Sequence, residues 1–145
     1  MGYTHSWLRP KALDREQFAV AAQDCRHICE ASGVPLQGIE GRAEPIFEKF
    51  IVAFSGGCEP FIVQCVCGLN SPERPRPSNP DEHRGFCKTE HLPYDLCVQG
   101  CLIAFQHHFG AEFAVSSDGD SSAWDAAREL CQRAVGYGAS FTLTD

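Results

Sequence analysis

The segment Pro93–Phe109, PYDLCVQGCLIAFQHHF, decides the fold of this chain. Pro93 suits the first turn of a helix, where its missing N–H costs nothing, and Asp95 in the same turn favours the helix dipole. The residues that follow are apolar on nearly every side of a helix, and Gly110 ends it. We therefore predict a central buried helix over 93–109 that the other elements cover.

Toward the N-terminus, residues 3–9 alternate and carry aromatic side chains, which predicts a strand. Tyr3, His5 and Trp7 share one face of this strand. Helices can cover one face of an antiparallel sheet and leave the other open. On the open face these side chains would form an aromatic platform beside a titratable histidine. On the covered face, Trp7 would belong to a minor core.

A helix follows the first strand. It begins at Asp14, with Gln17 three residues on as in a capping box, and ends at Gly33. Two further strands, 47–54 and 60–67, are joined by a glycine-rich turn and predict a hairpin.

The rest of the chain fits one domain of residues 1–145. Residues 70–85 hold four prolines among polar side chains and predict a solvated surface loop. After the central helix we expect a strand at 112–116, a last helix at 121–135 and a short edge strand at 141–143.

The first six elements have the order β-α-β-β-α-β, which is that of the ferredoxin-like split β-α-β. We therefore predict an α+β fold: an antiparallel sheet with helices on one face, plus a C-terminal helix. Such a fold commonly places the first strand centrally. The order alone does not fix which strands pair.

Composition excludes several classes of protein. Hydrophobic residues make up 43% and charged residues 21% of the chain, which is typical of a soluble globular protein. The net charge of −7 argues against nucleic acid as a partner, since such binding requires the neutralisation of phosphates. No apolar run is long enough to span a membrane, and no secretion signal opens the chain. We expect a cytoplasmic protein without a cofactor.

The nine cysteines have two interpretations. Several lie on the apolar stripes of predicted helices, where a free cysteine behaves as a small hydrophobic residue. In a reducing compartment we expect all nine as thiols. The alternative is a zinc-stabilised domain, although a C-x-C pair is not the usual C-x2-C spacing. Its ligands would be Cys58, Cys65, Cys67 and Cys87.

Three segments resemble an uncharacterised family of small bacterial and fungal proteins. Residues 2–7, GYTHSW, are similar to its GYTHYW opening, and residues 86–95, FCKTEHLPYD, to its FCKTARKPYD signature. Residues 116–119, SSDG, with Trp124 beyond them, are similar to its SSDG element. The resemblance spans nearly the whole chain, and it implies a common fold without implying an activity.

This chain departs from the signature at residues 90–92, where Glu-His-Leu replaces Ala-Arg-Lys. Two positive charges are lost, so the resemblance does not support anion binding at these positions.

The segments supply the candidate site residues, because polar groups in loops and at strand ends are where function concentrates. We expect the strand ends to converge with the start of the central helix, so that His5, Lys88, Tyr94 and Asp95 form one polar cluster. A structural cluster would pair Lys88 with Asp95 or Asp118, and Thr89 is a further polar group of the signature. Alternatively, Cys87 would be a nucleophile with His5 or His91 as its base and Asp95 or Asp118 orienting that base. The full candidate set is His5, Cys87, Lys88, Tyr94, Asp95 and Asp118.

The well-patterned core without a complete catalytic set favours a non-enzymatic binding or assembly domain, with protein partners or further copies of itself. The alternative is a small-molecule enzyme in which His5, Lys88, Asp95 and Asp118 perform acid–base chemistry.

Overall fold

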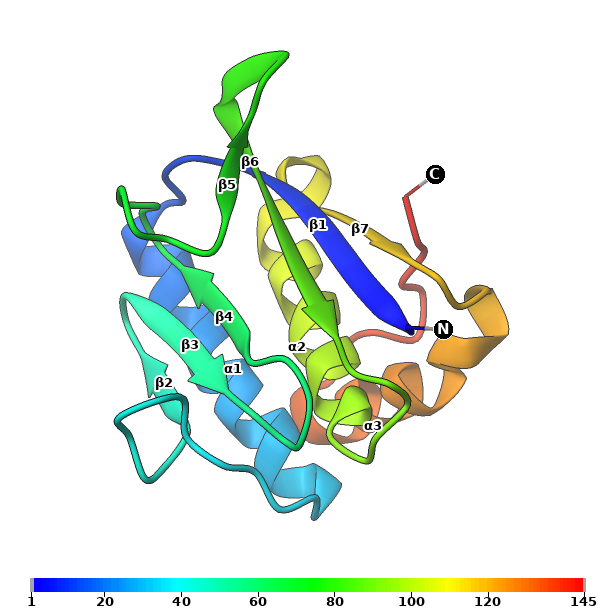
Figure 1. The fold of residues 1–145 in the computed structure, drawn as a ribbon. Coiled ribbons are helices and arrows are strands. Elements are labelled where there is room, and N and C mark those ends of the chain that lie inside the picture. Colours follow the sequence, from blue (N-terminus) through cyan, green and yellow to red (C-terminus); the bar gives the residue numbers. More distant parts are fainter. Residues whose placement is uncertain (1, 145) are drawn as a thin grey trace.

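The computed structural model describes residues 2–144, and within them the chain forms helices and two antiparallel sheets (Figure 1). The elements in chain order are β1 (Thr4–Pro10), α1 (Arg15–Ser32), β2 (Ile46–Glu48), β3 (Ile51–Phe54), β4 (Phe61–Gln64), β5 (Arg74–Arg76), β6 (Asn79–Lys88), α2 (Asp95–Phe109), the 3-10 turn η1 (Gly110–Glu112), β7 (Ala114–Ser117), the 3-10 turn η2 (Ser121–Trp124) and α3 (Asp125–Val135).

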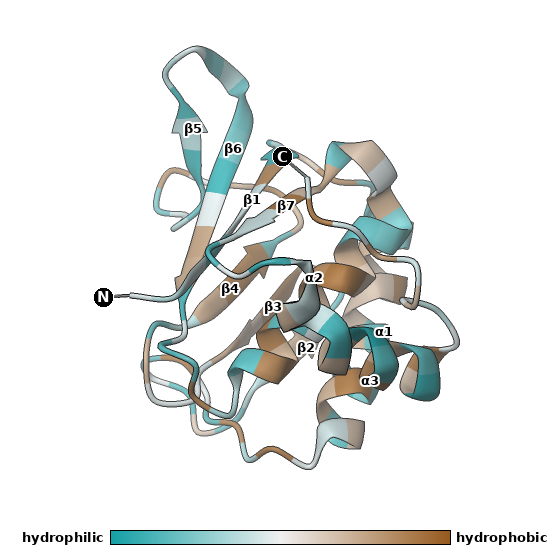
Figure 2. Ribbon diagram, turned by 90° about the vertical axis from the view of Figure 1, so that its right-hand side faces the viewer, coloured by the Kyte–Doolittle hydropathy of each residue, from teal (hydrophilic) through white to brown (hydrophobic). Residues whose placement is uncertain are grey.

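One sheet has the strand order β5-β6-β1-β7, and the other has the order β2-β3-β4. The helices lie on one side of these strands (Figures 1 and 2). The predicted α+β class, the helices on one face and the central position of β1 are therefore confirmed. The ferredoxin-like topology is not confirmed, because the hairpin β3–β4 pairs with β2 rather than with β1.

The division into two sheets follows from a turn that the pattern did not predict. The expected single strand 47–54 is wrong, because Lys49 and Phe50 turn the chain back on itself. Residues 46–48 and 51–54 then pair with each other as β2 and β3.

The predicted solvated loop at 70–85 is also wrong. Residues 74–76 and 79–88 form the hairpin β5–β6, which projects from the body of the molecule (Figure 1). Proline is compatible with an edge strand, because an N–H that faces solvent has no partner to lose. Pro75 lies in the edge strand β5, so the prolines did not exclude a strand here.

The predicted helix signals hold where the side chains make local hydrogen bonds. The Asp14 carboxylate accepts from the Gln17 N–H at 3.0 Å, and Gly33 ends α1 in the left-handed conformation. The central helix begins at Asp95, two residues later than predicted, and ten of its fifteen residues are buried. Residues 141–143 form no strand, although the Thr144 N–H donates to the Val115 carbonyl at 2.8 Å.

The side chains of Tyr3, His5 and Trp7 share one face of β1, as predicted, and this face points into the core. Their exposed fractions are 7%, 0% and 1%. The interpretation as an open aromatic platform is therefore wrong, and Trp7 packs instead against Phe61 and Phe113. The open face of the sheet carries the alternate residues of β1.

We expect Gly85→Ala to destabilise the fold because Gly85 lies opposite Trp7 in the β1–β6 register. An added Cβ would lie 2.2 Å from the buried indole ring, which has no room to retreat. Overpacking of this kind costs about 1–3 kcal/mol. Urea denaturation measures the effect, with Gly68→Ala as the control because its added Cβ meets no atom within 4 Å. Equal stabilities of the two variants would contradict the packing described.

Candidate functional site

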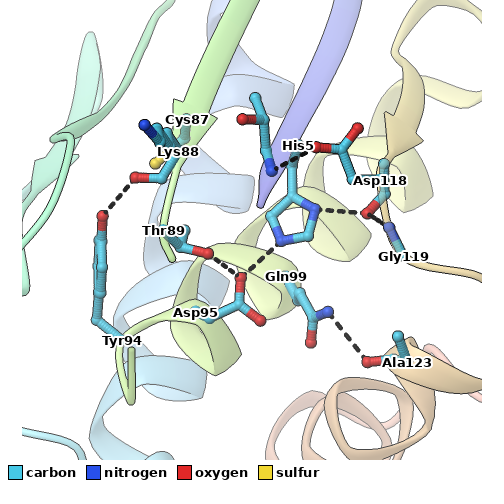
Figure 3. Close-up of polar contacts among 12 residues, drawn as sticks. His5, Cys87, Lys88, Thr89, Tyr94, Asp95, Gln99, Asp118, Gly119 and Ala123 are labelled. Carbon is cyan, nitrogen blue, oxygen red and sulfur yellow. Dashed lines mark hydrogen bonds and ion pairs between the residues drawn. The ribbon is translucent and has the colours of Figure 1, made fainter. Parts of the chain in front are cut away.

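A hydrogen-bonded chain of side chains lies where β1, β7 and α2 meet (Figure 3). The His5 Nε2 atom lies 2.6 Å from the Asp95 Oδ1 atom, and His5 Nδ1 lies 2.8 Å from the Ser117 hydroxyl. The Thr89 hydroxyl donates to the same Asp95 oxygen at 2.6 Å, and the Gly119 N–H donates to the Ser117 hydroxyl at 3.0 Å. We call His5, Thr89, Asp95 and Ser117 the His5 network.

Strand register and a strained turn assemble this network. His5 is opposite Cys87 in β6 and opposite Ser117 in β7, so β1 holds it between the two neighbouring strands. After β6, residues 90 and 91 adopt positive φ angles of 55° and 59°. This conformation is uncommon without glycine, and it turns the chain from Thr89 back toward the first residue of α2.

Aromatic rings enclose the imidazole of His5. The ring centroids of Tyr3 and Trp124 lie 5.0 and 4.9 Å from it, both in edge-to-face contact. His91 stacks on Tyr3 at 3.6 Å and covers this side of the network. Burial and the nearby Asp95 charge raise the pKa of Tyr3, so its hydroxyl stays protonated. His5 is therefore fully enclosed, whereas Asp95 and Ser117 are partly exposed at the edge of the core.

The structure brings together only part of the predicted cluster. His5 and Asp95 are in direct contact, as expected. Lys88 is outside it, with its Nζ atom 3.2 Å from Glu90, so the expected pairing of Lys88 with Asp95 or Asp118 is wrong. Asp118 instead accepts from the N–H of Thr4 at 3.0 Å.

Cys87 lies opposite His5 in the β1–β6 register, but neither Cys87 nor Tyr94 bonds to the His5 network (Figure 3). Cys87 is fully buried, and burial raises the pKa of its thiol to about 12. A thiol in this state is not a nucleophile near neutral pH, so the structure does not support Cys87 as a catalytic residue. The Tyr94 hydroxyl donates to the Glu59 carbonyl at 2.6 Å, and burial raises its pKa.

Sequence reasoning missed Ser117 in the network, and it noted Thr89 only as a polar group of the signature segment. Both lie inside segments that carry the family resemblance, FCKT and SSDG. Their position in those segments was a usable signal. Neither residue type is titratable near neutral pH, so a search for acids and bases passes over them.

A second buried polar centre was not predicted. Arg9 and Glu73 form an ion pair at 3.1 Å, and their side chains are 0% and 1% exposed. The Trp7 indole N–H donates to Glu73 at 2.8 Å, and Arg9 also donates to the carbonyls of Gln64 and Cys65. Burial raises the pKa of Glu73, and the charge of Arg9 opposes this rise. Glu73 lies among prolines, which is why the sequence pattern placed it in a solvated loop.

The candidate zinc ligands do not form a common site. Cys65 contacts the carbonyl of Leu13, whereas Cys87 contacts the carbonyl of Glu59. Across residues 2–144, no group of three or more His, Cys, Asp or Glu side chains is placed to hold a metal ion. All nine cysteines are present as thiols.

Comparison with known proteins adds no relative. Within the described part of the chain, no helix combines the length and apolar character that crossing a membrane requires. No protein-family model, no curated protein and no solved structure matches this chain.

Proposed function

We propose that this chain is a non-enzymatic binding or assembly domain of the cytoplasm, in which the outer face of the four-stranded sheet contacts a further copy of itself. The observation that carries the proposal is Phe86, whose side chain is 55% exposed in the middle of that face. A large apolar side chain exposed on a sheet is informative when neighbouring apolar groups extend it.

Apolar residues do extend it. Phe86 is opposite Ser6, and Leu8 follows two residues along β1, so Phe86 and Leu8 are diagonal neighbours on one face. On the other neighbouring strand, β7, Ala114 is opposite Leu8. The Arg84 guanidinium lies 5.7 Å from the centre of the Phe86 ring and flanks this strip. Arginine and aromatic residues are enriched at protein–protein contacts.

The sheet edges support contact through the face rather than through strand addition. The C-terminal segment lies along β7, where the Thr144 N–H donates to Val115. At the other edge, Pro75 interrupts the donors of β5. Proline and short length both blunt an edge strand.

The fold is consistent with this proposal as a variant of the split β-α-β arrangement. The elements β1-α1-β5-β6-α2-β7 have the ferredoxin-like order, and the sheet β2-β3-β4 is inserted between α1 and β5. We also propose that the chain belongs to the family that its motifs resemble. The support for this is that the motif segments, although far apart in the sequence, meet at the His5 network.

Sedimentation velocity over a range of concentrations tests the assembly. We expect wild-type protein to self-associate and Phe86→Asp to remain monomeric. Phe50→Asp is the matched control, since Phe50 is 56% exposed and lies outside the four-stranded sheet. A wild-type protein that stays monomeric, or a Phe50→Asp variant that loses association equally, would contradict assembly through this face.

One observation favours a second function, hydrolysis by a serine nucleophile. Ser117, His5 and Asp95 have the separations of a nucleophile, its base and the group that orients the base. Ser117 also lines a cavity of about 530 Å³. The network nevertheless encloses His5 completely, and the Gly119 N–H is already used to hold the Ser117 hydroxyl.

A fluorophosphonate probe separates the two functions. In a reactive site the Ser117 oxygen would bond to phosphorus, fluoride would leave, and His5 would take the hydroxyl proton. A binding domain predicts no adduct by intact-mass analysis. A stoichiometric adduct on Ser117 that Asp95→Asn abolishes would establish the hydrolase instead.

A further inference from the structure

A cavity of about 650 Å³ lies at the base of the hairpin β5–β6, away from the residues of the His5 network and of the outer sheet face. Its wall comes from three segments: Lys11 just after β1, residues 67–75 from the loop after β4 into β5, and residues 80–83 in the first half of β6. The polar lining residues that matter here are Lys11, Ser71, Arg74, Asp81 and His83.

His83 is the unexplained group in this wall. Its side chain is 5% exposed, and neither ring nitrogen makes a hydrogen bond to any residue from 2 to 144. Nδ1 is sealed from solvent, so the ring can meet a ligand in the cavity only through its Nε2 edge. Buried polar groups are nearly always hydrogen-bonded in native proteins. Nε2 has no partner among these residues and is therefore available to a ligand in the cavity, whereas the unpaired Nδ1 is a cost that such a ligand does not relieve.

The state of His83 suits a hydrogen-bond donor without a charge. Burial lowers its pKa, and the positive charges of Arg9 and Lys11 lower it further. The ring is thus neutral near pH 7. In the tautomer that carries its proton on Nε2, the accessible edge of the ring is a donor.

The charges around the cavity favour an anion. Lys11 and Arg74 are both exposed, and neither forms an ion pair within the part of the chain that the structure describes. Glu73 faces the cavity but is committed to Arg9, which leaves Asp81 as the opposing acid. A chain with a net charge of −7 therefore concentrates two unpaired cations beside one neutral donor.

We propose that this cavity binds the oxyanion group, carboxylate or phosphate, of a small molecule. Lys11 and Arg74 supply the positive charge, and His83 Nε2 donates the hydrogen bond that fixes its orientation. Arginine and lysine both bind oxyanions through charge-assisted hydrogen bonds, which are stronger than neutral ones. The site depends neither on assembly through the sheet face nor on the His5 network.

Two-dimensional ¹H–¹⁵N NMR titrations with inorganic phosphate and with acetate test the proposal. Sodium chloride keeps the ionic strength at about 0.15 M, where the Debye length is about 8 Å. We expect shifts of the amides of Lys11, Ser71 and His83 that saturate as the anion concentration rises. The anion that saturates at the lower concentration identifies the source of the oxyanion.

Variants then separate a site from general charge attraction. Lys11→Gln with Arg74→Gln, and separately His83→Gln, should each weaken binding about tenfold, which corresponds to 1.4 kcal/mol. The control is Lys49→Gln with Arg133→Gln, which removes the same charge from exposed positions outside the cavity and should leave affinity unchanged.

Shifts that rise linearly without saturation for both anions would overturn the proposal. So would an equal loss of affinity in the control variant. Because the dispersion of each variant's spectrum reports folding directly, loss of binding is scored only on folded protein. If His83→Gln alone fails to fold, the Lys11 and Arg74 variant decides the question.

Discussion

Replacing Glu73 by glutamine is expected to lower the free energy of unfolding by about 3–5 kcal/mol, the usual cost of breaking a buried ion pair. The carboxylate accepts from Arg9, from the Trp7 indole and from the backbone N–H of Gln64. Glutamine keeps the size of the side chain but leaves Arg9 as a buried charge without a counter-charge. The same change also weakens the attachment of the segment before β5 to β1.

Urea denaturation of Glu73→Gln and Glu82→Gln measures this effect with a matched control. Glu82 pairs with Arg76, and both side chains are about one-third exposed. An exposed pair of this kind contributes only about 0–1 kcal/mol. A loss below about 1 kcal/mol in Glu73→Gln would show that the buried pair does not hold the structure together.

Leu102→Ala is expected to cost about 2–5 kcal/mol, because it empties a filled site at the centre of the fold. Leu102 is completely buried in α2, which contacts both other helices. Leu69→Ala serves as the control, since Leu69 is 97% exposed and surface changes usually stay within about 0.5 kcal/mol. Chemical denaturation followed by circular dichroism measures both variants. Equal losses would place α2 at the periphery.

The sequence predicted those elements whose signals are local. The alternation in β1, the Asp14 cap and the apolar surround of α2 each depend on residues within a few positions of one another. The division of the strands into two sheets depends on which edges meet in space. The turn at Lys49 and Phe50 that causes it carries neither glycine nor proline, so nothing in the pattern marks it.

The candidate site was predicted only in part, because some of its contacts depend on which strands pair in space. His5 and Asp95 are ninety residues apart, and their contact followed from the expected convergence of the strand ends with the helix start. The direction in which the β1 side chains point did not follow, since alternation gives two faces and does not say which one the helices cover. Ser117 could be assigned to the network only from the register of β7 against β1, which places it opposite His5.

We propose that the His5 network serves to hold the fold together rather than to catalyse a reaction. Asp95→Asn tests it, with Asp125→Asn as control, because each aspartate is the first residue of a helix and contributes a similar dipole interaction. The Asp125 side chain is 74% exposed, whereas that of Asp95 is 15% exposed and accepts from His5 and Thr89.

The decisive measurement is the difference in unfolding free energy between these two variants in urea. We expect Asp95→Asn to lose about 1.5–3 kcal/mol, the value of hydrogen bonds to a charged group, and Asp125→Asn to lose less than about 1 kcal/mol. An Asp95→Asn variant as stable as Asp125→Asn, or more stable than wild type, would contradict this proposal. That result would identify Asp95 as a residue kept for function at the expense of stability.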